Sequence, residues 1–346
     1  VNVMVKGNMR DRLNALNRRN RIVVPLCPDV DFMNIDTEKL IVKDSYSRPV
    51  IIPFIDGFGR TKLIMFKNDD VRKDHVILNI IDMIGEILKK ESDDLDIETI
   101  KYDVVPTSSG SGYIEIVENA KTIFEITEKE GLTIQNYILN HNKDMSIGAF
   151  RERFIKSTAM HCVISYLLGF GDRHLDNIMI SENGLLYHID FGYILGQDPK
   201  YSNNRMIRVT PEIVNVIGGY GTEYYDYFKT VCVRIYNILR PHVNLFSNLL
   251  SVVPNIDPEM TLEIINRELS DRFEIGENHI QAATHMDNKV ESANGFDSMI
   301  VDLLHKSRQN TFVKGIAGSI NGSINTLTGS LGQLTGFMGI FNKTDS

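Results

Sequence analysis

The sequence predicts an α+β fold of two lobes, a small β-rich lobe followed by a larger, mainly helical one. Between residues 40 and 66, short runs of branched and aromatic residues alternate with turns, which is typical of an antiparallel sheet. The segment 148–170 is apolar nearly all round, which indicates a buried central helix. A hairpin pattern at 178–189 follows it, with polar residues at both ends. A chain of 346 residues is long enough to bury a sizeable core.

Composition limits the classes of function. The chain has 37 Lys and Arg against 45 Asp and Glu, and its net charge of -8 argues against general nucleic-acid binding. Cys27, Cys162 and Cys232 are far apart and form no metal-ligand pair, so we expect small buried apolar groups in a reducing cytosol. The most apolar run, 160–170, is far below the roughly 20 residues that span a bilayer. We therefore expect a cytoplasmic protein that meets membranes only peripherally.

The first 21 residues are expected to form a separate basic helix. Six Lys or Arg residues in this segment stand against one acid, Asp11. Met9, Leu13 and Leu16 recur at helical spacing, so the helix should be amphipathic. Two roles remain open for it, packing on the small lobe and contact with anionic lipid.

The small lobe is expected over residues 22–118. A tight turn at 56–59 joins two of its strands. Apolar residues between 76 and 88 have helical spacing, and Asp74 is placed to cap that helix. The expected strands lie at 40–42, 50–54, 63–66, 100–105 and 113–117.

The large lobe is expected over residues 119–309. Helices at 133–142 and 148–170 lead into the hairpin. A loop at 197–211 follows the hairpin, and the chain should be helical from residue 212 to about 309. Pro241 and Pro254 should break this helical run, because proline cannot continue a helix.

The hairpin joins two elements that phosphoryl transfer requires. Its ends should meet, so Asn177 and Asp190 should face one site. In protein kinases, an Asn amide oxygen and the carboxylate of an Asp-Phe-Gly hold the magnesium ions that bridge the ATP phosphates. Asp172 precedes Asn177 by five positions, as the catalytic Asp precedes the Asn of the protein-kinase loop.

The order of the loop residues points to one kinase superfamily. The chain has Asp-Arg-His at 172–174, where protein kinases have His-Arg-Asp. This reversal resembles the phosphatidylinositol 3-/4-kinase superfamily, which also includes some protein kinases. The segments 171–177 and 188–196 resemble the class III phosphatidylinositol 3-kinase most. The resemblance covers about residues 22–309 and implies a two-lobed protein-kinase-like fold that uses ATP with Mg²⁺ or Mn²⁺.

The resemblance assigns phosphate-binding residues in the small lobe. Lys67, at the end of the third expected strand, is similar to the lysine that pairs with the ATP phosphates. The following run, 68–74, resembles the family pattern Lys-x-x-Asp-Asp-Leu-Arg-Gln-Asp, with one residue missing between Lys67 and Asp69. The turn 45–49 resembles the family's Ser-x-x-x-Pro phosphate loop, which implies that Ser45 holds a phosphate.

The resemblance also implies an adenine pocket. The segment 112–118 is similar to the family's hinge, so the carbonyl of Glu115 and the N–H of Val117 would meet the adenine edge. Tyr102 matches a tyrosine deep in that pocket. Met179 and Ile189 would form the apolar floor beneath adenine.

The remaining site residues belong to the loop and the Asp-Phe-Gly. Asn177 and Asp190 would hold the metal. His174 is the expected proton acceptor from the inositol hydroxyl, because an imidazole with a pKa near 6.5 suits that role at neutral pH. Asp172 is the competing base. His188 is expected to be structural.

The expected activity is ATP-dependent phosphorylation of the inositol ring of phosphatidylinositol, at the 3-position. Only Lys200, Arg205 and Arg208 supply positive charge in the loop 197–211, so we expect unphosphorylated phosphatidylinositol as the substrate in membranes. The alternatives are a phosphatidylinositol 4-kinase, a protein Ser/Thr kinase of the same superfamily, and a non-catalytic nucleotide-binding scaffold. Upstream or regulatory protein subunits are further possible partners.

Residues 310–346 form a Gly- and Ser-rich tail with its own pattern. No charged residue occurs between 315 and 342, and eight apolar residues recur there at steps of three or four. The opposite face includes seven glycines, each costing about 1 kcal/mol of helix stability relative to Ala. Burying large apolar side chains at about 1.5–3 kcal/mol each would offset that cost at a membrane. The apolar residues are Ile316, Ile320, Ile324, Leu327, Leu331, Leu334, Met338 and Phe341.

We therefore predict that the tail, over about 312–341, folds as an amphipathic helix on curved membranes and stays unfolded in water. The polar face is uncharged, so binding should depend on curvature rather than on anionic lipid. Circular dichroism of residues 310–346 with small and large neutral liposomes tests this prediction. No helix on either, or equal helix on both, would instead favour a flexible linker or a segment that docks on a partner.

Overall fold

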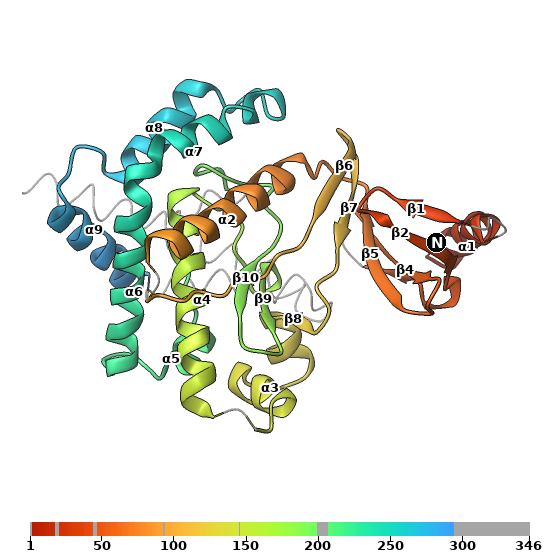
Figure 1. Cartoon of the computed structure of the whole chain (residues 1–346), viewed down its shortest axis with the longest axis horizontal. Helices are drawn as coiled ribbons and strands as arrows, with labels where there is room; N and C mark the ends of the chain where they lie inside the picture. The colour runs from red at the N-terminus through yellow and green to blue at the C-terminus, as the bar shows by residue number, and fades with distance from the viewer. Residues whose placement is uncertain are drawn as a thin grey trace, which may run out of the picture. The chain divides into compact units, whose positions relative to one another are not determined.

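A computed structural model describes residues 2–17, 21–43, 47–92, 94–144, 146–198 and 207–293 (Figure 1). Side chains are described from residue 9 onward. Residues 1–294 form one unit, and everything below belongs to it. Within this unit, an antiparallel sheet comes first and a mainly helical region follows, so the two-lobed α+β fold predicted from the sequence is confirmed. Ser45, Lys200, Arg205 and the tail lie outside the described residues.

The small lobe contains a seven-stranded sheet among the described residues. Its strands pair antiparallel in the order β1-β2-β4-β5-β7-β6, and β3 pairs with β4. Buried residues of β2, β4 and β5, including Phe32, Phe54 and Ile64, form its core. The strands are β1 (Ile22–Val24), β2 (Cys27–Ile35), β3 (Ile41–Val42), β4 (Val50–Asp56), β5 (Thr61–Lys67), β6 (Val104–Ser108) and β7 (Ser111–Glu115).

Strands β3, β4 and β5 lie where the sequence predicts strands, whereas β1 and β2 were not predicted. The strand β2 buries only Cys27, Phe32 and Ile35 along its length, so it lacks the alternation that identifies a half-buried strand. The expected strands at 100–105 and 113–117 are displaced in the structure to β6 and β7. The close hairpin between β6 and β7 explains the shift, because Ser108 pairs directly with Ser111.

The helix α1 (Asn2–Leu16) packs on the small lobe. Met9, Leu13 and Leu16 lie against the core of the sheet. Just after the helix, the Asn17 side chain donates to the carbonyl of Ile35 at 3.0 Å and accepts from its N–H at 2.8 Å. Of the two roles left open for this segment, the structure therefore contains the packing role.

The helix α2 (Arg72–Glu91) contacts both lobes, touching β6 on one side and α6 and α7 on the other. The prediction that Asp74 caps this helix is wrong. The helix begins after Val71, which provides no side-chain cap, and Asp74 lies in the first turn with its side chain buried. Its carboxylate has a partner across the lobe boundary, which local sequence does not reveal.

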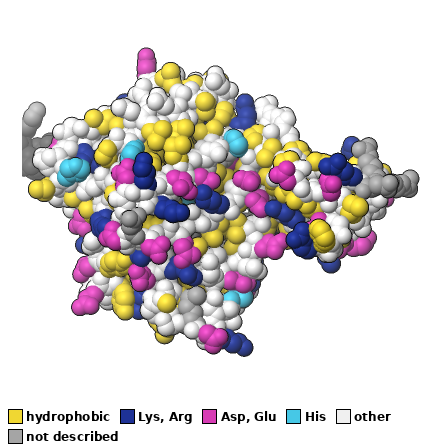
Figure 2. Space-filling view, viewed as in Figure 1, with side chains coloured by type: hydrophobic (Ala, Val, Ile, Leu, Met, Phe, Trp, Pro, Cys, Tyr) yellow, Lys and Arg dark blue, Asp and Glu magenta, His cyan; other side chains and the backbone are white. Residues whose placement is uncertain are grey.

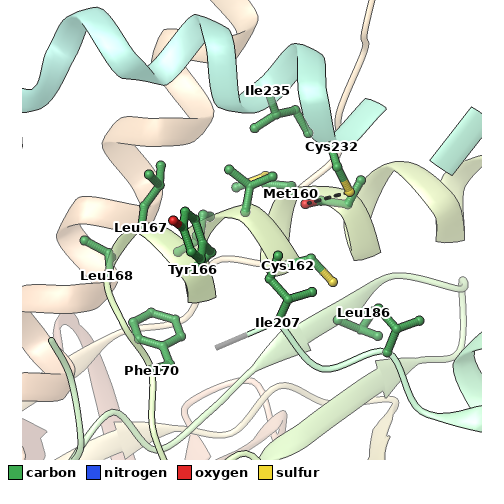
Figure 3. Close-up of a cluster of buried hydrophobic side chains, with 14 of the residues drawn as sticks. Met160, Cys162, Tyr166, Leu167, Leu168, Phe170, Leu186, Ile207, Cys232 and Ile235 are labelled. Carbon is green, nitrogen blue, oxygen red and sulfur yellow. Dashed lines mark hydrogen bonds between the residues drawn. The ribbon is translucent and has the colours of Figure 1, made fainter. Parts of the chain in front are cut away.

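The large lobe is built around α4 (Ile147–Leu167), and the prediction of a buried central helix is confirmed. Ser146 caps its N-terminus by accepting from the N–H of Ala149. Met160, Tyr166 and Leu167 of this helix belong to one buried apolar cluster with Ile235 of α6 (Glu223–Leu239), part of which Figure 3 shows. All three cysteines are free and buried, as expected. The helix α3 (Ile134–His141) precedes α4 in the chain, and Thr133 caps it.

The expected hairpin is present as β9 (Ile178–Ser181) and β10 (Leu186–His188), which pair antiparallel. A short strand that the sequence analysis missed, β8 (Ala120–Thr122), pairs with the outer edge of β9. The other strand of the hairpin, β10, contacts α4. The hairpin therefore packs on the central helix of the large lobe.

The described region after residue 210 is helical, as expected, but more finely divided; the end of the expected helical run, 294–309, lies outside the described residues. Gly218, Gly219 and Gly221 have positive φ and separate two helices that the sequence analysis merged. Pro241 and Pro254 lie in short 3₁₀ turns, in agreement with the expected breaks. The helices are α5 (Pro211–Ile217), α6, α7 (Val243–Leu250), α8 (Leu262–Phe273) and α9 (His279–Ser292). No helix in the described part of the chain is both long and apolar enough to cross a membrane.

Candidate active site

The hairpin brings Asn177 and Asp190 to one end of the three-stranded sheet. Ile178 pairs with His188, and the N–H of Ile189 donates to the carbonyl of Asn177 at 3.2 Å. The residues just before β9 and just after β10 are therefore neighbours. This is the arrangement that the hairpin pattern predicted.

Two aspartates of the site have unusual backbone conformations. Asp172 has φ of 52° and Asp190 has φ of 61°, in the left-handed region that non-glycine residues seldom adopt. Such conformations persist only where the surroundings fix them, and they concentrate at functional sites. The surroundings of Asp190 are therefore informative.

Lys67 reaches Asp190 from the other lobe. Its Nζ lies 3.3 Å from Oδ2 of Asp190 and 3.4 Å from Oδ2 of Asp69. The Lys67 side chain is mostly buried, and burial alone would lower its pKa, but Asp190, Asp74 and Asp69 together raise it. Lys67 is therefore a fixed positive charge, which suits a phosphate-binding role.

Asp74 supports the Asp-Phe-Gly from behind. Its Oδ1 accepts from the backbone N–H of Phe191 at 2.9 Å, across 117 residues of sequence. Burial, reinforced by the negative charge of Asp190, raises the pKa of Asp74 to about 6. The pKa of Asp190 is lowered instead: burial opposes ionisation, but Lys67 and Arg173 outweigh it. The two carboxyl groups thus differ, and Asp190 is held in its ionised form more strongly than Asp74.

Arg173, the middle residue of Asp-Arg-His, is buried and holds the two motifs together. It donates to the carbonyls of Gly171 at 2.8 Å and Ile189 at 2.7 Å, and also to the carbonyl of Asp190. Its guanidinium lies over the rings of Phe170 and Phe191. Sequence reasoning gave Arg173 no role, because nothing in its neighbourhood indicates that a charged residue is buried there.

The loop before the hairpin positions the two candidate bases. The N–H of Asp176 donates to Nδ1 of His174 at 3.2 Å, so the neutral ring carries its proton on Nε2. That Nε2 lies 3.8 Å from Oδ2 of Asp172. Asn177 donates through Nδ2 to the carbonyl of Asp172 at 2.9 Å, which directs its amide oxygen elsewhere. Both candidate bases therefore lie in one loop with the candidate metal ligand.

The oxygen atoms of Asn177 and Asp190 suit a hard divalent cation. Asn177 has one amide oxygen left for a metal, and the Asp190 side chain is about half exposed (46%). No three His, Cys, Asp or Glu side chains of the described segments form a metal-binding group. A cation here would complete its coordination with other oxygens, as it does when nucleotide phosphates are ligands.

The expected adenine-binding residues lie on both sides of the lobe junction. Tyr102 packs against Tyr187 with ring centroids 6.1 Å apart, and burial together with the charge of Asp74 raises its pKa well above 10. Met179 and Ile189 are partly buried at the hairpin. Glu115 ends β7, where its carboxylate pairs with Lys62 at 2.7 Å. Glu115 and Val117 also line a cavity of about 460 Å³ that includes neither Lys67 nor Asp190.

The loop after the Asp-Phe-Gly differs from the expectation at one position. Arg208, one of the three cations counted for the loop 197–211, is buried (9% exposed). Its neighbours Ile207 and Val209 belong to the core of the large lobe. Arg208 is therefore not a surface cation for a lipid headgroup.

The fold is that of a two-lobed, protein-kinase-like catalytic domain. A family model described as phosphatidylinositol 3- and 4-kinase matches residues 60–255. The chain belongs to this family, and it carries the family's catalytic domain. The family implies ATP and a divalent metal as cofactors.

Individual relatives agree with this assignment. The chain is 32% identical over 305 residues to the phosphatidylinositol 3-kinase VPS34 of Candida glabrata, an alignment that covers 84% of this chain and 33% of that protein. It is 31% identical to VPS34 of Saccharomyces cerevisiae, with 87% and 35% covered, and to VPS34 of Arabidopsis thaliana, with 88% and 40% covered. The chain thus spans between a third and two fifths of the length of these relatives.

His188 is buried beside the site, next to a second histidine. The rings of His188 and His161 meet edge to face with centroids 5.3 Å apart, and neither Nδ1 has a hydrogen-bond partner among the described residues. Burial lowers the pKa of His161 to about 3 and holds the pKa of His188 well below 6.5. Both rings are therefore neutral packing groups, in line with the structural role expected for His188.

This pair predicts a loss of stability in acid. An unfolded histidine binds a proton below about pH 6.5, and the folded state resists that protonation until the pH nears the lowered pKa. Stability is thus present above pH 6.5 and falls below it, by about 1.4 kcal/mol per pH unit for each such histidine. His161→Phe should remove one of these contributions and flatten the dependence.

Denaturant unfolding of the native chain and His161→Phe between pH 7 and 5 measures the difference. The matched control is His279→Phe, at an exposed position on α9. Parallel pH dependences for the native chain and His161→Phe would contradict the prediction.

Proposed function

We propose that this domain transfers the γ-phosphoryl group of ATP to the 3-hydroxyl of the inositol ring of phosphatidylinositol. The observation that carries the proposal is the meeting of Lys67, Asn177 and Asp190 at the end of the hairpin, with Lys67 3.3 Å from Asp190. Transfer of phosphate requires mainly positioning and neutralisation of charge, and these groups supply both. The similarity to phosphatidylinositol 3-kinases supports the 3-position.

In this proposal, residues of both lobes bind the nucleotide. Lys67 and Ser45 hold the phosphates, and Asn177 and Asp190 hold Mg²⁺ or Mn²⁺, which neutralises phosphate charge when bound. Tyr102, Met179 and Ile189 surround the adenine, with the backbone of Glu115 and Val117 at its edge. The lowered pKa of Asp190 keeps its carboxylate available as a metal ligand at neutral pH.

Two residues compete as the base that accepts the inositol proton. We propose His174, which the N–H of Asp176 holds in a defined orientation. Accepting a proton at Nε2 requires the neutral ring to carry its proton on Nδ1 instead, so the hydrogen bond from Asp176 must break. Asp172 needs no such change.

The distribution of positive charge bears on which lipid the domain binds. With Arg208 buried, Lys200 and Arg205 are the remaining cations in the loop 197–211, which supports unphosphorylated phosphatidylinositol as the substrate. On the face shown in Figure 2, basic and acidic side chains are interspersed and no broad basic area is visible. We propose a cytoplasmic domain that binds membranes peripherally, with the segment 312–341 supplying curvature-dependent contact.

The test is labelled phosphate transfer from ATP to phosphatidylinositol vesicles with magnesium present, followed by chromatographic identification of the product isomer. We expect phosphatidylinositol 3-phosphate from the native chain. Asp190→Ala should lower the rate by about a hundredfold or more, because losing a metal carboxylate costs several kcal/mol of transition-state stabilisation. The matched control is Asp94→Ala, which replaces an exposed aspartate shortly after the end of α2.

Each alternative has its own result in this assay. A 4-phosphate product would make the chain a phosphatidylinositol 4-kinase, and transfer only to protein would make it a protein kinase. Equal transfer by the native chain and Asp190→Ala would contradict the assigned site. ATP binding without any transfer would indicate a scaffold.

For the base, His174→Gln should abolish the pH dependence of kcat near neutral pH, while Asp172→Asn should preserve it.

A further inference from the structure

Besides Lys67, a second lysine contacts the segment that follows the Asp-Phe-Gly. This lysine is Lys73, at the start of α2. Its Nζ lies 2.7 Å from Oδ2 of Asp257, 3.1 Å from Oε1 of Gln197 and 3.1 Å from the carbonyl of Gly192. An ammonium group has three N–H donors, and all three are used here. Asp257 lies 184 positions away in sequence, between α7 and α8.

The three side chains close a ring. Gln197 accepts from Lys73 through Oε1 and donates to Oδ2 of Asp257 through Nε2 at 2.9 Å. Asp257 also accepts from the N–H of Glu259 at Oδ1, which fixes its orientation. Each member thus restrains the other two. We call Lys73, Gln197 and Asp257 the α2 ring.

The ring is largely shielded from water. The Lys73 and Asp257 side chains are 14% and 18% exposed. Burial alone would raise the pKa of Asp257, but the hydrogen bonds from Lys73 and Gln197 lower it. A shielded ion pair that loses one partner leaves an uncompensated charge, so the ring should persist as a unit.

The segment that the ring holds belongs to the site. Gly192 is the glycine of the Asp-Phe-Gly, two residues after Asp190. Gln197 packs against Gly171, the first residue of the Gly-Asp-Arg-His loop, so closely that a Cβ at Gly171 would meet the Gln197 carbonyl oxygen at 2.0 Å. The N–H of Gly171 donates to the carbonyl of Tyr193 at 3.0 Å. Segment 192–197 is therefore held by the catalytic loop on one side and by the α2 ring on the other.

We propose that Lys73 is a positioning residue for phosphoryl transfer, acting through Gln197 and Asp257 on the segment 192–197. Lys67 contacts Asp190 from the small lobe, and Lys73 holds the chain that leaves Asp190. The orientation of the Asp190 carboxylate is thereby fixed at both its side chain and its backbone.

The inference rests on the proposed kinase activity, and two readouts separate the two. The first is hydrogen–deuterium exchange of the full chain over residues 192–198, which needs no activity. Lys73→Met should increase exchange there, because the carbonyl of Gly192 and the Gln197 side chain lose their donor. The second readout is steady-state kinetics with phosphatidylinositol vesicles. A misplaced catalytic group can lower a rate by about a hundredfold, so we expect kcat to fall about 10- to 100-fold. The KM for ATP should change by less than about threefold, because the nucleotide contacts remain.

A double-mutant cycle tests whether the ring acts as a unit. Asp257→Asn should lower kcat as well, and Lys73→Met with Asp257→Asn should be no slower than the slower single variant. The matched control is Lys229→Met, which removes a lysine that joins α6 to Asp287 and Glu291 of α9, away from the site. This control should leave kcat and the exchange of 192–198 unchanged.

The outcomes are distinct. A native chain that transfers no phosphate contradicts the proposed function, while increased exchange in Lys73→Met would still support the positioning role. Unchanged exchange over 192–198 overturns the inference. Multiplicative effects in the double variant, or a loss of kcat that Lys229→Met reproduces at the same fall in melting temperature, also overturn it.

Discussion

The conformation of Asp190 is the constraint on which the rest of the site depends. Its φ of 61° is strained for a residue with a Cβ, at a cost on the order of 1–3 kcal/mol. Arg173 offsets that cost by donating hydrogen bonds to the carbonyls of both Ile189 and Asp190. Asp74 binds the next N–H along the chain, and Lys67 pairs with the carboxylate itself. Three charged neighbours thus hold Asp190 in its strained conformation.

These neighbours come from both lobes, so the site exists only when the lobes are assembled. Lys67 ends β5 of the small lobe, and Asp74 lies on α2, which contacts both lobes. Arg173 comes from the loop that follows α4. The hairpin β9–β10 then brings Asn177 beside Asp190 through local pairing alone. A local motif thus supplies the proposed metal ligands, and long-range contacts orient them.

This division explains how much could be predicted from the sequence. Helical periodicity located α3 and α4, and short runs of branched and aromatic residues located β4 and β5. The hairpin joined Asn177 to Asp190 because its pairing is local. Burial of Arg173 and Arg208 could not be predicted, since their partners or covering residues come from distant parts of the chain. Asp74 was taken for a helix cap because its true partner, the N–H of Phe191, lies 117 residues away.

We propose that buried charges hold Asp190 in position to bind a divalent metal together with ATP. Calorimetric titration of ATP into the full chain, with and without magnesium, tests it most directly when the native chain is compared with Arg173→Met. The account predicts that magnesium tightens ATP binding to the native chain and that Arg173→Met, although folded, loses most of this tightening. If magnesium tightens ATP binding equally in both proteins, Arg173 does not orient Asp190 and the account is contradicted.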